Sequence, residues 1–223
     1  MTFNGYDGDI YVSRNGHLAI CGHEMQFGTF QLDTITMTFN PGTSDDVAVV
    51  LMDTAGNAKW GRIIPATNQY PVTTYACAVD DSANVYFGVQ MSDLLQFGGN
   101  TLSNPTSLSV YSALLRYDAQ GNEDWGIAMG GDYGRSFVYD ITVNTEQQAV
   151  FAGKYITTPT VPGFLGNVSL PMGTSLVVAK TDSAGNVLWV KTDNAIAQGG
   201  SEAHSVALMP GGKYVVAGNT QEV

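Results

Sequence analysis

The feature that most constrains the fold of this chain is an internal repeat, D-x-x-G-N-x-x-W, which occurs three times. Each copy ends on a tryptophan, and the three tryptophans of the chain lie 65 and 64 residues apart. Self-similarity at a fixed spacing of this size is typical of repeat architectures, in which one supersecondary unit stacks on copies of itself. We therefore treat the fixed positions of the motif as structural-repeat residues: Asp53, Gly56, Asn57, Trp60, Asp118, Gly121, Asn122, Trp125, Asp182, Gly185, Asn186 and Trp189.

Apolar runs recur in phase with this motif and divide each repeat into four expected strands. The first strand alternates apolar and other residues, as at Ile10 and Val12, which is typical of a strand with one buried face. The second strand is apolar at nearly every position and the third is similar, which is typical of burial on both faces. The D-x-x-G-N segment is expected to be the turn between strands three and four. Its aspartate can accept nearby backbone N–H groups, and its glycine can adopt a positive φ.

Sheets of this kind must stack to bury both faces, and radial stacking of four-stranded units gives a β-propeller. We expect an all-β fold, a partial β-propeller of four-stranded antiparallel blades with a repeat of about 65 residues, in which each tryptophan packs against the adjacent blade. The blades span about 9–67, 74–131 and 137–196, and a fourth, 202–223, supplies only strands one and two. Because propellers close with about 4–8 blades, we expect that a missing segment or another chain completes the ring, or that the blades form an open stack.

The motif resembles that of a known repeat family. Residues 180–189, KTDSAGNVLW, match the pattern K-x-D-x-x-G-N-x-x-W of the seven-bladed beta-propeller repeat (SBBP) family. Residues 80–88 match the second half of the family pattern, except that Ala83 replaces the turn glycine, and residues 144–153 lack both Asp and Gly in their turn. The resemblance extends from about Asp9 to Gly218. It implies a propeller fold and a bacterial or archaeal extracellular or surface protein, without implying a molecular activity.

The chain is also similar, more weakly, to quinoprotein-type propeller repeats, in which an Asp, a Gly and a Trp also close each blade. That pattern has one more residue between the Asp and the Trp than Asp53 to Trp60 has. The residues that quinoproteins use around pyrroloquinoline quinone and calcium are not recognisable in this sequence.

The composition excludes several classes of protein. Asp and Glu total 20 against 9 Lys and Arg, a net charge of −11, so no basic surface is available to neutralise nucleic-acid phosphates. No apolar run approaches the roughly 20 residues that span a bilayer, and no secretory signal is visible at the start of the chain. The two cysteines, Cys21 and Cys77, lie in apolar strand-like runs. They are expected to be buried thiols, with a disulfide between neighbouring units as the alternative.

Few residues are candidates for chemistry. His17, His23 and Glu24 are of metal-ligand type, but the second strand of the first repeat separates His17 from the other two. The adjacent acids Asp45–Asp46 and Asp80–Asp81 are possible Ca²⁺ ligands, although the turn explanation needs no metal. His204, near Glu202, is expected to be structural. No G-x-S-x-G motif is present, and the innermost strands show no repeated acid or base, so we expect neither a catalytic residue nor a cofactor.

These observations favour a non-catalytic, acidic repeat module that acts as a binding or structural scaffold in a secreted, cell-surface or virion assembly. The long connections between strands two and three vary in sequence, and we expect them to contact a protein or glycan partner. Two alternatives remain open at this point. One is a carbohydrate-binding surface built from Tyr and Trp, and the other is a lyase or hydrolase with its active site in the central channel of a completed propeller.

Overall fold

The computed structural model describes residues 8–24, 28–39, 46–65, 73–91, 94–103, 110–131, 135–158, 160–193 and 200–220. Every regular element in these ranges is a β-strand, so the predicted all-β class is confirmed. None of the described residues belongs to a helix that could cross a membrane.

The strands form antiparallel sheets that follow the repeats in the sequence. Three sheets contain strands one to four of a repeat, hydrogen-bonded in chain order, and we number them sheets one to three; sheet four has two strands. Sheet one consists of β1 (Gly8–Val12), β2 (Leu18–Glu24), β5 (Asp46–Met52) and β6 (Ala58–Ile64). Sheet two consists of β7 (Thr73–Val79), β8 (Val85–Met91), β11 (Tyr111–Tyr117) and β12 (Glu123–Gly130). Sheet three consists of β13 (Ser136–Val143), β14 (Ala149–Ile156), β17 (Thr174–Thr181) and β18 (Val187–Thr192), and sheet four of β19 (Glu202–Met209) and β20 (Lys213–Asn219).

The expected strands are therefore present in the expected order, while the unit boundaries expected at 67, 196 and 223 lie outside the described residues. The connections between strands two and three differ from the expectation, because each contains a short hairpin. These hairpins are β3 (Thr29–Leu32) with β4 (Ile35–Thr38), β9 (Leu95–Phe97) with β10 (Asn100–Leu102), and β15 (Gly163–Leu165) with β16 (Val168–Leu170). Strands of three or four residues are too short to show a clear periodic signal. The third hairpin also pairs with β12, which extends sheet two to six strands.

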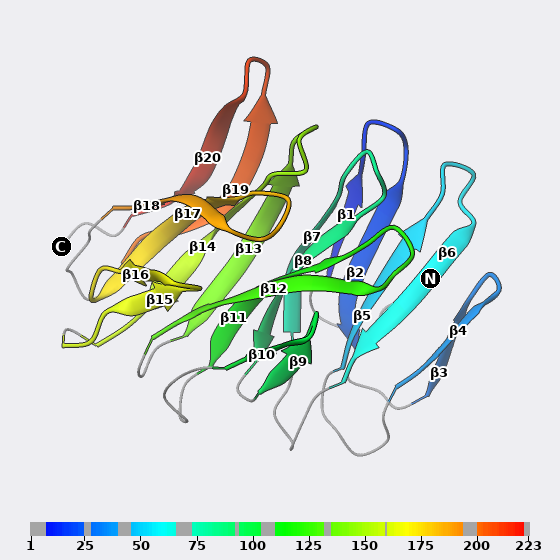
Figure 1. The fold of residues 1–223 in the computed structure, drawn as a ribbon, viewed down its shortest axis with the longest axis horizontal. Helices are drawn as coiled ribbons and strands as arrows, with labels where there is room; N and C mark the ends of the chain where they lie inside the picture. Colours follow the sequence, from blue (N-terminus) through cyan, green and yellow to red (C-terminus); the bar gives the residue numbers. More distant parts are fainter. Residues whose placement is uncertain are drawn as a thin grey trace.

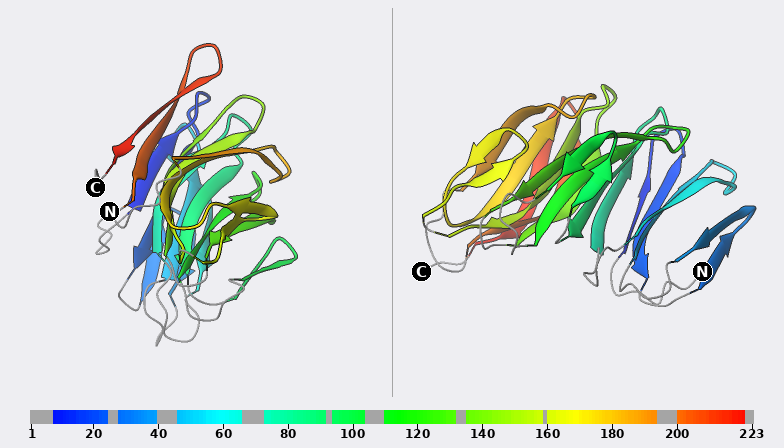
Figure 2. Two further views of the ribbon diagram at one scale, coloured as in Figure 1. Left: turned by 90° about the vertical axis from the view of Figure 1, so that its left-hand side faces the viewer. Right: turned by 60° about the horizontal axis from the view of Figure 1, so that its bottom comes forward.

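The sheets lie face to face in sequence order along the longest axis of the molecule (Figures 1 and 2). Strand β7 packs against β1 and β2, β13 against β7 and β8, and β19 against β13 and β14. A separate hydrophobic cluster fills each of the three gaps. Phe87 of β8 points into the gap between sheets one and two, whereas its neighbour Tyr86 points into the gap between sheets two and three. This double burial explains why the second strand is apolar at successive positions.

The expectation about which face of the first strand is buried is wrong for β1. Ile10 and Val12 were expected on a buried face, but they are 64% and 60% exposed. Tyr11, on the other side of β1, packs against the clusters between the sheets. The side of sheet one that carries Ile10 and Val12 faces away from sheet two. The hairpin β3–β4 covers part of the sheet near β6, where Met37 lies against Gly61, and does not bury Ile10 or Val12.

Candidate functional site

Each D-x-x-G-N segment forms a tight turn that its own aspartate closes. Asp53 Oδ1 accepts the backbone N–H groups of Ala55 and Asn57, both at 2.9 Å, and the Asn57 side chain donates to the same carboxylate. The turns at 118–122 and 182–186 have the same bonds. The glycines at positions 56, 121 and 185 have φ values of 84°, 77° and 83°, a left-handed conformation that side chains with a Cβ rarely adopt.

These hydrogen bonds favour the ionised carboxylates. The Asn57 side chain, followed by backbone N–H donors, lowers the pKa of Asp53 below its ordinary value. The Asn186 side chain does the same to the pKa of Asp182. At Asp118 burial is the largest single effect and raises the pKa, but the Asn122 side chain and three backbone groups together lower it below its ordinary value.

The tryptophan of one sheet contacts the turn of the next sheet. Trp60 Nε1 donates to the carbonyl of Ala119 at 3.1 Å, and Trp125 Nε1 donates to the carbonyl of Ser183 at 3.0 Å. In both cases the acceptor is the residue that follows the turn aspartate. A Cβ at Gly121 would lie 2.8 Å from Cδ2 of Trp60, and one at Gly185 would lie 2.6 Å from Cδ2 of Trp125. We call this contact the indole–turn joint.

The joint requires the motif glycine for two reasons, the positive φ and the close approach of the indole. The joint also buries two of the three tryptophans: Trp60 and Trp125 are only 6% and 7% exposed. Neither ring is available to stack on a sugar. The third tryptophan, Trp189, lies edge-on to Tyr214 of sheet four, with 6.3 Å between ring centroids.

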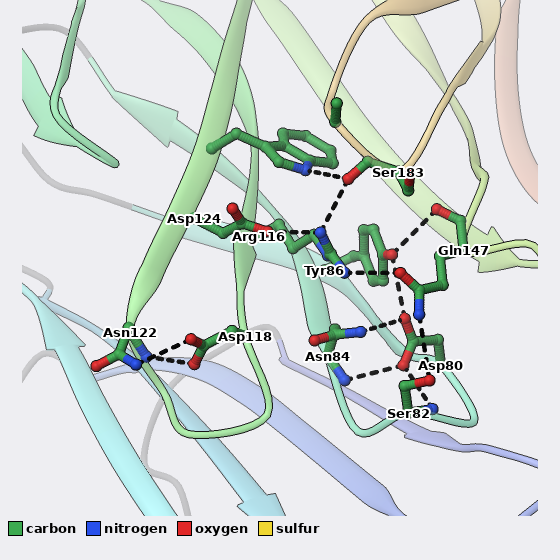
Figure 3. Close-up of polar contacts among 12 residues, drawn as sticks. Asp80, Ser82, Asn84, Tyr86, Arg116, Asp118, Asn122, Asp124, Gln147 and Ser183 are labelled. Atoms are coloured by element: carbon green, nitrogen blue, oxygen red, sulfur yellow. Dashed lines mark hydrogen bonds and ion pairs between the residues drawn. The ribbon is translucent and has the colours of Figure 1, made fainter.

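A buried polar network reinforces the joint between sheets two and three (Figure 3). Arg116 of β11 bonds Asp124 at 2.5 Å and donates to the Ser183 carbonyl at 2.9 Å and to the Gln147 side chain at 3.1 Å. Its guanidinium also lies over the ring of Tyr86, 5.4 Å from the centroid. One cation therefore ties together two strands of sheet two and two turns of sheet three.

Asp80 closes the turn between β7 and β8 at the edge of this network (Figure 3). Its carboxylate accepts the backbone N–H groups of Ser82 and Asn84, the Asn84 amide at 2.8 Å and the Tyr86 hydroxyl at 3.2 Å. Burial raises the pKa of Tyr86 above its usual range. Asp81 accepts the backbone N–H of Arg14. Of the acids predicted as possible calcium ligands, Asp80 and Asp81 therefore bond to the protein itself. Asp46 is buried in β5, and Asp45 lies outside the described residues.

The first strands of the four sheets together line a hollow of about 390 Å³, with residues such as Tyr11, Asp140 and Thr142 on its wall. Two carboxylates on these strands hold equivalent positions, four residues before the turn that begins at Ser13 or Asn144. Asp9 accepts the N–H groups of Ile10 at 2.8 Å and of Cys77, in the next sheet, at 2.9 Å.

Asp140 has the same arrangement. It accepts the N–H groups of Ile141 at 2.8 Å and of Val206, in the next sheet, at 2.7 Å, and it also bonds the Ser205 hydroxyl. Strand one is the edge of its sheet, so these N–H groups have no strand partner and the carboxylates satisfy them. The expectation that no acid recurs on the innermost strands is therefore wrong. The segments DIYV at 9–12 and DITV at 140–143 were the available signal.

The other candidate ligands are not brought together. His17 precedes β2 and His23 is buried near the opposite end of that strand; the side chain of Glu24 lies outside the described part. His204 Nε2 lies 3.2 Å from a carboxylate oxygen of Glu202, and its ring packs on that of Tyr139. Among the described residues, no three His, Cys, Asp or Glu side chains gather as a metal site.

The two cysteines are free and buried in adjacent sheets, Cys21 in β2 and Cys77 in β7. Burial, followed by the neighbouring Cys21, raises the pKa of the Cys77 thiol well above its usual range.

No protein-family model matches this chain. A stretch of 86 residues, 39% of the chain, is 30% identical to Regulatory protein FlaEY of Caulobacter vibrioides. The match spans only 9% of the length of that protein. The chain is thus similar to a small part of a much longer regulatory protein, and its relation to the SBBP family stays a prediction.

Proposed function

We propose that this chain is an arc of a β-propeller and that it works as a non-catalytic module, a binding or structural scaffold in a secreted, cell-surface or virion assembly. The arrangement of the sheets supports the first part. Successive four-stranded sheets stack face to face, their first strands share one hollow, and the indole–turn joint recurs at the same place. In a closed propeller the innermost strands line the central channel.

The observation that carries the non-catalytic part is the bonding of the acids on the first strands. A general acid or base must be within reach of substrate and free to exchange a proton. In Asp9 and Asp140 both carboxylate oxygens accept backbone N–H groups, one from the same strand and one from the next sheet. These groups hold neighbouring sheets together.

The hairpins between strands two and three are the proposed contact surface for a protein or glycan partner. An open groove of about 760 Å³ lies between β9–β10 and β15–β16. Its lining combines apolar side chains, such as Ile127 and Phe164, with hydroxyl and amide groups, such as Thr101, Asn167 and Ser169. Loops that a rigid scaffold positions in this way commonly carry binding function.

Two measurements test this proposal. The small-angle X-ray scattering curve of the purified chain is expected to match the curve calculated for the stacked arc; a curve that fits only a compact, unstacked particle would contradict it. A screen with chromogenic esters, glycosides and uronate polymers compares the wild-type chain with Asp140→Asn. We expect a lower melting temperature for the variant and no turnover by either protein. Turnover that Asp140→Asn abolishes at an unchanged melting temperature would overturn the non-catalytic assignment.

A further inference from the structure

We propose that the first strands of sheets two to four bind a neutral glycan, whose sugar rings stack on a row of aromatic side chains and whose hydroxyl groups bond in the adjoining hollow. The site is separate from the groove between the hairpins. It rests on the proposed function, because it uses the first strands as the lining of a channel. A repeated β-bulge, the ring contacts that it creates and the polar hollow beside it support the inference.

The bulge recurs in the first strand of three sheets. At one residue of each strand the register with strand two shifts, and that residue has no partner in the ladder. The unpaired residues are Tyr75 of β7, Tyr139 of β13 and His204 of β19, which lie 64 and 65 positions apart. A bulge bends its strand and redirects the side chain of the extra residue. The repeat therefore places a flat ring at the same position of three successive first strands.

These rings contact one another from sheet to sheet. The ring centroid of Tyr139 lies 6.1 Å from that of Tyr75 and 5.0 Å from that of His204. Phe137 stacks on Tyr139 at 5.3 Å, with 11° between the ring planes. We call these four side chains the aromatic row. The hydrophobic clusters that the described residues form contain none of its rings, and all four are at least partly exposed. The row is therefore a surface feature and does not belong to the core.

Polar groups border the row. The Glu202 carboxylate bonds Lys154 of sheet three at 2.5 Å and lies 3.2 Å from Nε2 of His204, whose side chain is 46% exposed. Burial, followed by the neighbouring Glu202 and Tyr75, raises the pKa of Tyr139 above its usual range, so its hydroxyl stays protonated and can donate. Aromatic rings beside fixed donors and acceptors suit a sugar, which has an apolar C–H face and a rim of hydroxyl groups.

The hollow of about 390 Å³ continues the site along the same strands. Asp140, directly after Tyr139, lies on its wall. The Tyr11 and Thr142 hydroxyl oxygens, also on the wall, are 3.4 Å apart. Since two residues of a strand span only about 7 Å, a chain of several sugars can reach both parts. One sugar would then stack on the row while the next one exchanges hydrogen bonds in the hollow.

The charges in and beside the site select a neutral glycan. Acids outnumber bases there, and the whole chain carries a net charge of −11. A uronate, sulfate or phosphate group would therefore be repelled. The charged residues are Asp80, Asp81, Asp140 and Glu202 against Arg14 and Lys154.

A cationic ligand is a poorer occupant, although the site is acidic. Cation–π binding needs ring faces that are open to the cation. Phe137 and Tyr139 instead stack on each other, and Tyr75 lies edge-on to Tyr139. Trp60 and Trp125 are buried in their joints, so the aromatic row is the better platform for a sugar.

The test is isothermal titration calorimetry of the purified chain with five neutral oligosaccharides, namely cello-, malto-, manno-, galacto- and chitohexaose. Hexagalacturonate is the acidic counterpart. We expect saturable binding of at least one neutral hexamer and weaker or no binding of hexagalacturonate. The binding isotherm is then repeated with variants of the chain whose melting temperatures match that of the wild type.

Tyr75→Leu removes one ring of the row and is expected to weaken binding by roughly three- to tenfold. Tyr75→Phe keeps the ring and is expected to bind nearly as tightly as the wild type. This pair separates stacking from a general loss of structure. Tyr11→Phe removes one hydroxyl of the hollow and is expected to weaken binding as well. The matched control is Phe164→Leu, in the groove between the hairpins, which is expected to leave binding unchanged.

Three outcomes would overturn the inference. The first is that none of the five neutral hexamers binds. The second is that hexagalacturonate binds at least as tightly as they do. The third is that Phe164→Leu weakens binding and Tyr75→Leu does not, which would move the glycan to the groove between the hairpins. If the scattering curve still matches the arc, only the glycan site is rejected; a curve that does not match rejects the proposed function as well.

Discussion

Gly121 lies directly against the indole of Trp60, so that a Cβ at this position would be 2.8 Å from Cδ2 of the ring. The same relation holds between Gly185 and Trp125, whereas a Cβ at Gly56 would meet nothing within 4 Å. Three glycines with nearly equal φ therefore differ in whether an indole from the preceding sheet lies against them.

This difference predicts unequal costs of alanine. All three Gly→Ala variants pay for a left-handed alanine, about 1–2 kcal/mol. Gly121→Ala and Gly185→Ala must also displace an indole, which adds about 1–3 kcal/mol of overpacking. Urea unfolding of the three variants measures the difference, with Gly56→Ala as the matched control. Equal losses at all three positions would contradict the joint.

The tryptophans predict a second contrast. Trp60→Phe removes an indole N–H and leaves the carbonyl of Ala119 without this donor, so the expected loss is about 1–3 kcal/mol. Trp125→Phe removes the same kind of bond, but Arg116 still donates to the carbonyl of Ser183, so the expected loss is about 0.5–1.5 kcal/mol. Within the described ranges Trp189 donates no such bond, so Trp189→Phe is expected to cost less than either. Thermal unfolding of the three variants at one pH tests this order, and a larger loss at Trp189 would refute it.

The turn aspartates predict how stability depends on pH. Their pKa values are lowered in the folded chain, so their contribution is fully present above the unfolded value of about 3.9 and is lost as the pH falls through the lower folded values. We expect the urea midpoint to fall below about pH 4. Asp182→Asn is expected to lower the midpoint at pH 6 and to reduce its dependence on pH between 2.5 and 4. An unchanged acid slope would show that Asp182 does not contribute.

A structural feature could be predicted from the sequence when it is long and local, and not when it is short or depends on residues far away in the chain. The long apolar strands and the motif turn are local, and they recur, so the order of strands one to four within sheets one to three followed from the sequence. The hairpins β3–β4, β9–β10 and β15–β16 are too short for periodicity to reveal. Asp9 and Asp140 were visible in the sequence, but their role depends on N–H groups of Cys77 and Val206, 68 and 66 residues away, which only the stacking brings close.

The exposure of Ile10 and Val12 could not be predicted either, because it depends on where the neighbouring sheet lies. Alternation tells which residues share a face of β1, but not which face another sheet covers. The network around Arg116 was also missed, because its partners Gln147 and Ser183 come from two turns of the next sheet, and neither turn has a sequence signal that marks it as an acceptor.

Arg116 predicts a loss of stability on truncation. Arg116→Met would remove the buried cation, leave Asp124 and the Gln147 side chain without this donor, and leave the Ser183 carbonyl with the Trp125 indole as its donor. Because the Asp124 side chain is 40% exposed and water can solvate it, the expected cost is about 1–3 kcal/mol. Arg116→Lys keeps the charge but cannot reach these acceptors with a planar fork, so we expect an intermediate loss. Denaturant unfolding of both variants tests this, and wild-type stability of Arg116→Met would show that the network is unimportant.

The cysteines give a prediction that tests burial and pairing at once. Cys21 and Cys77 are free thiols with almost no exposure, and burial raises the pKa of Cys77, so few thiolates are available to react. We expect no reaction with Ellman's reagent in the native chain at pH 8. After unfolding in guanidinium without reductant, two thiols per chain are expected to react. Rapid labelling of the native protein would contradict the packing of β2 against β7. If the unfolded chain shows no thiols, the two cysteines are oxidised to a disulfide and are not the free thiols described above.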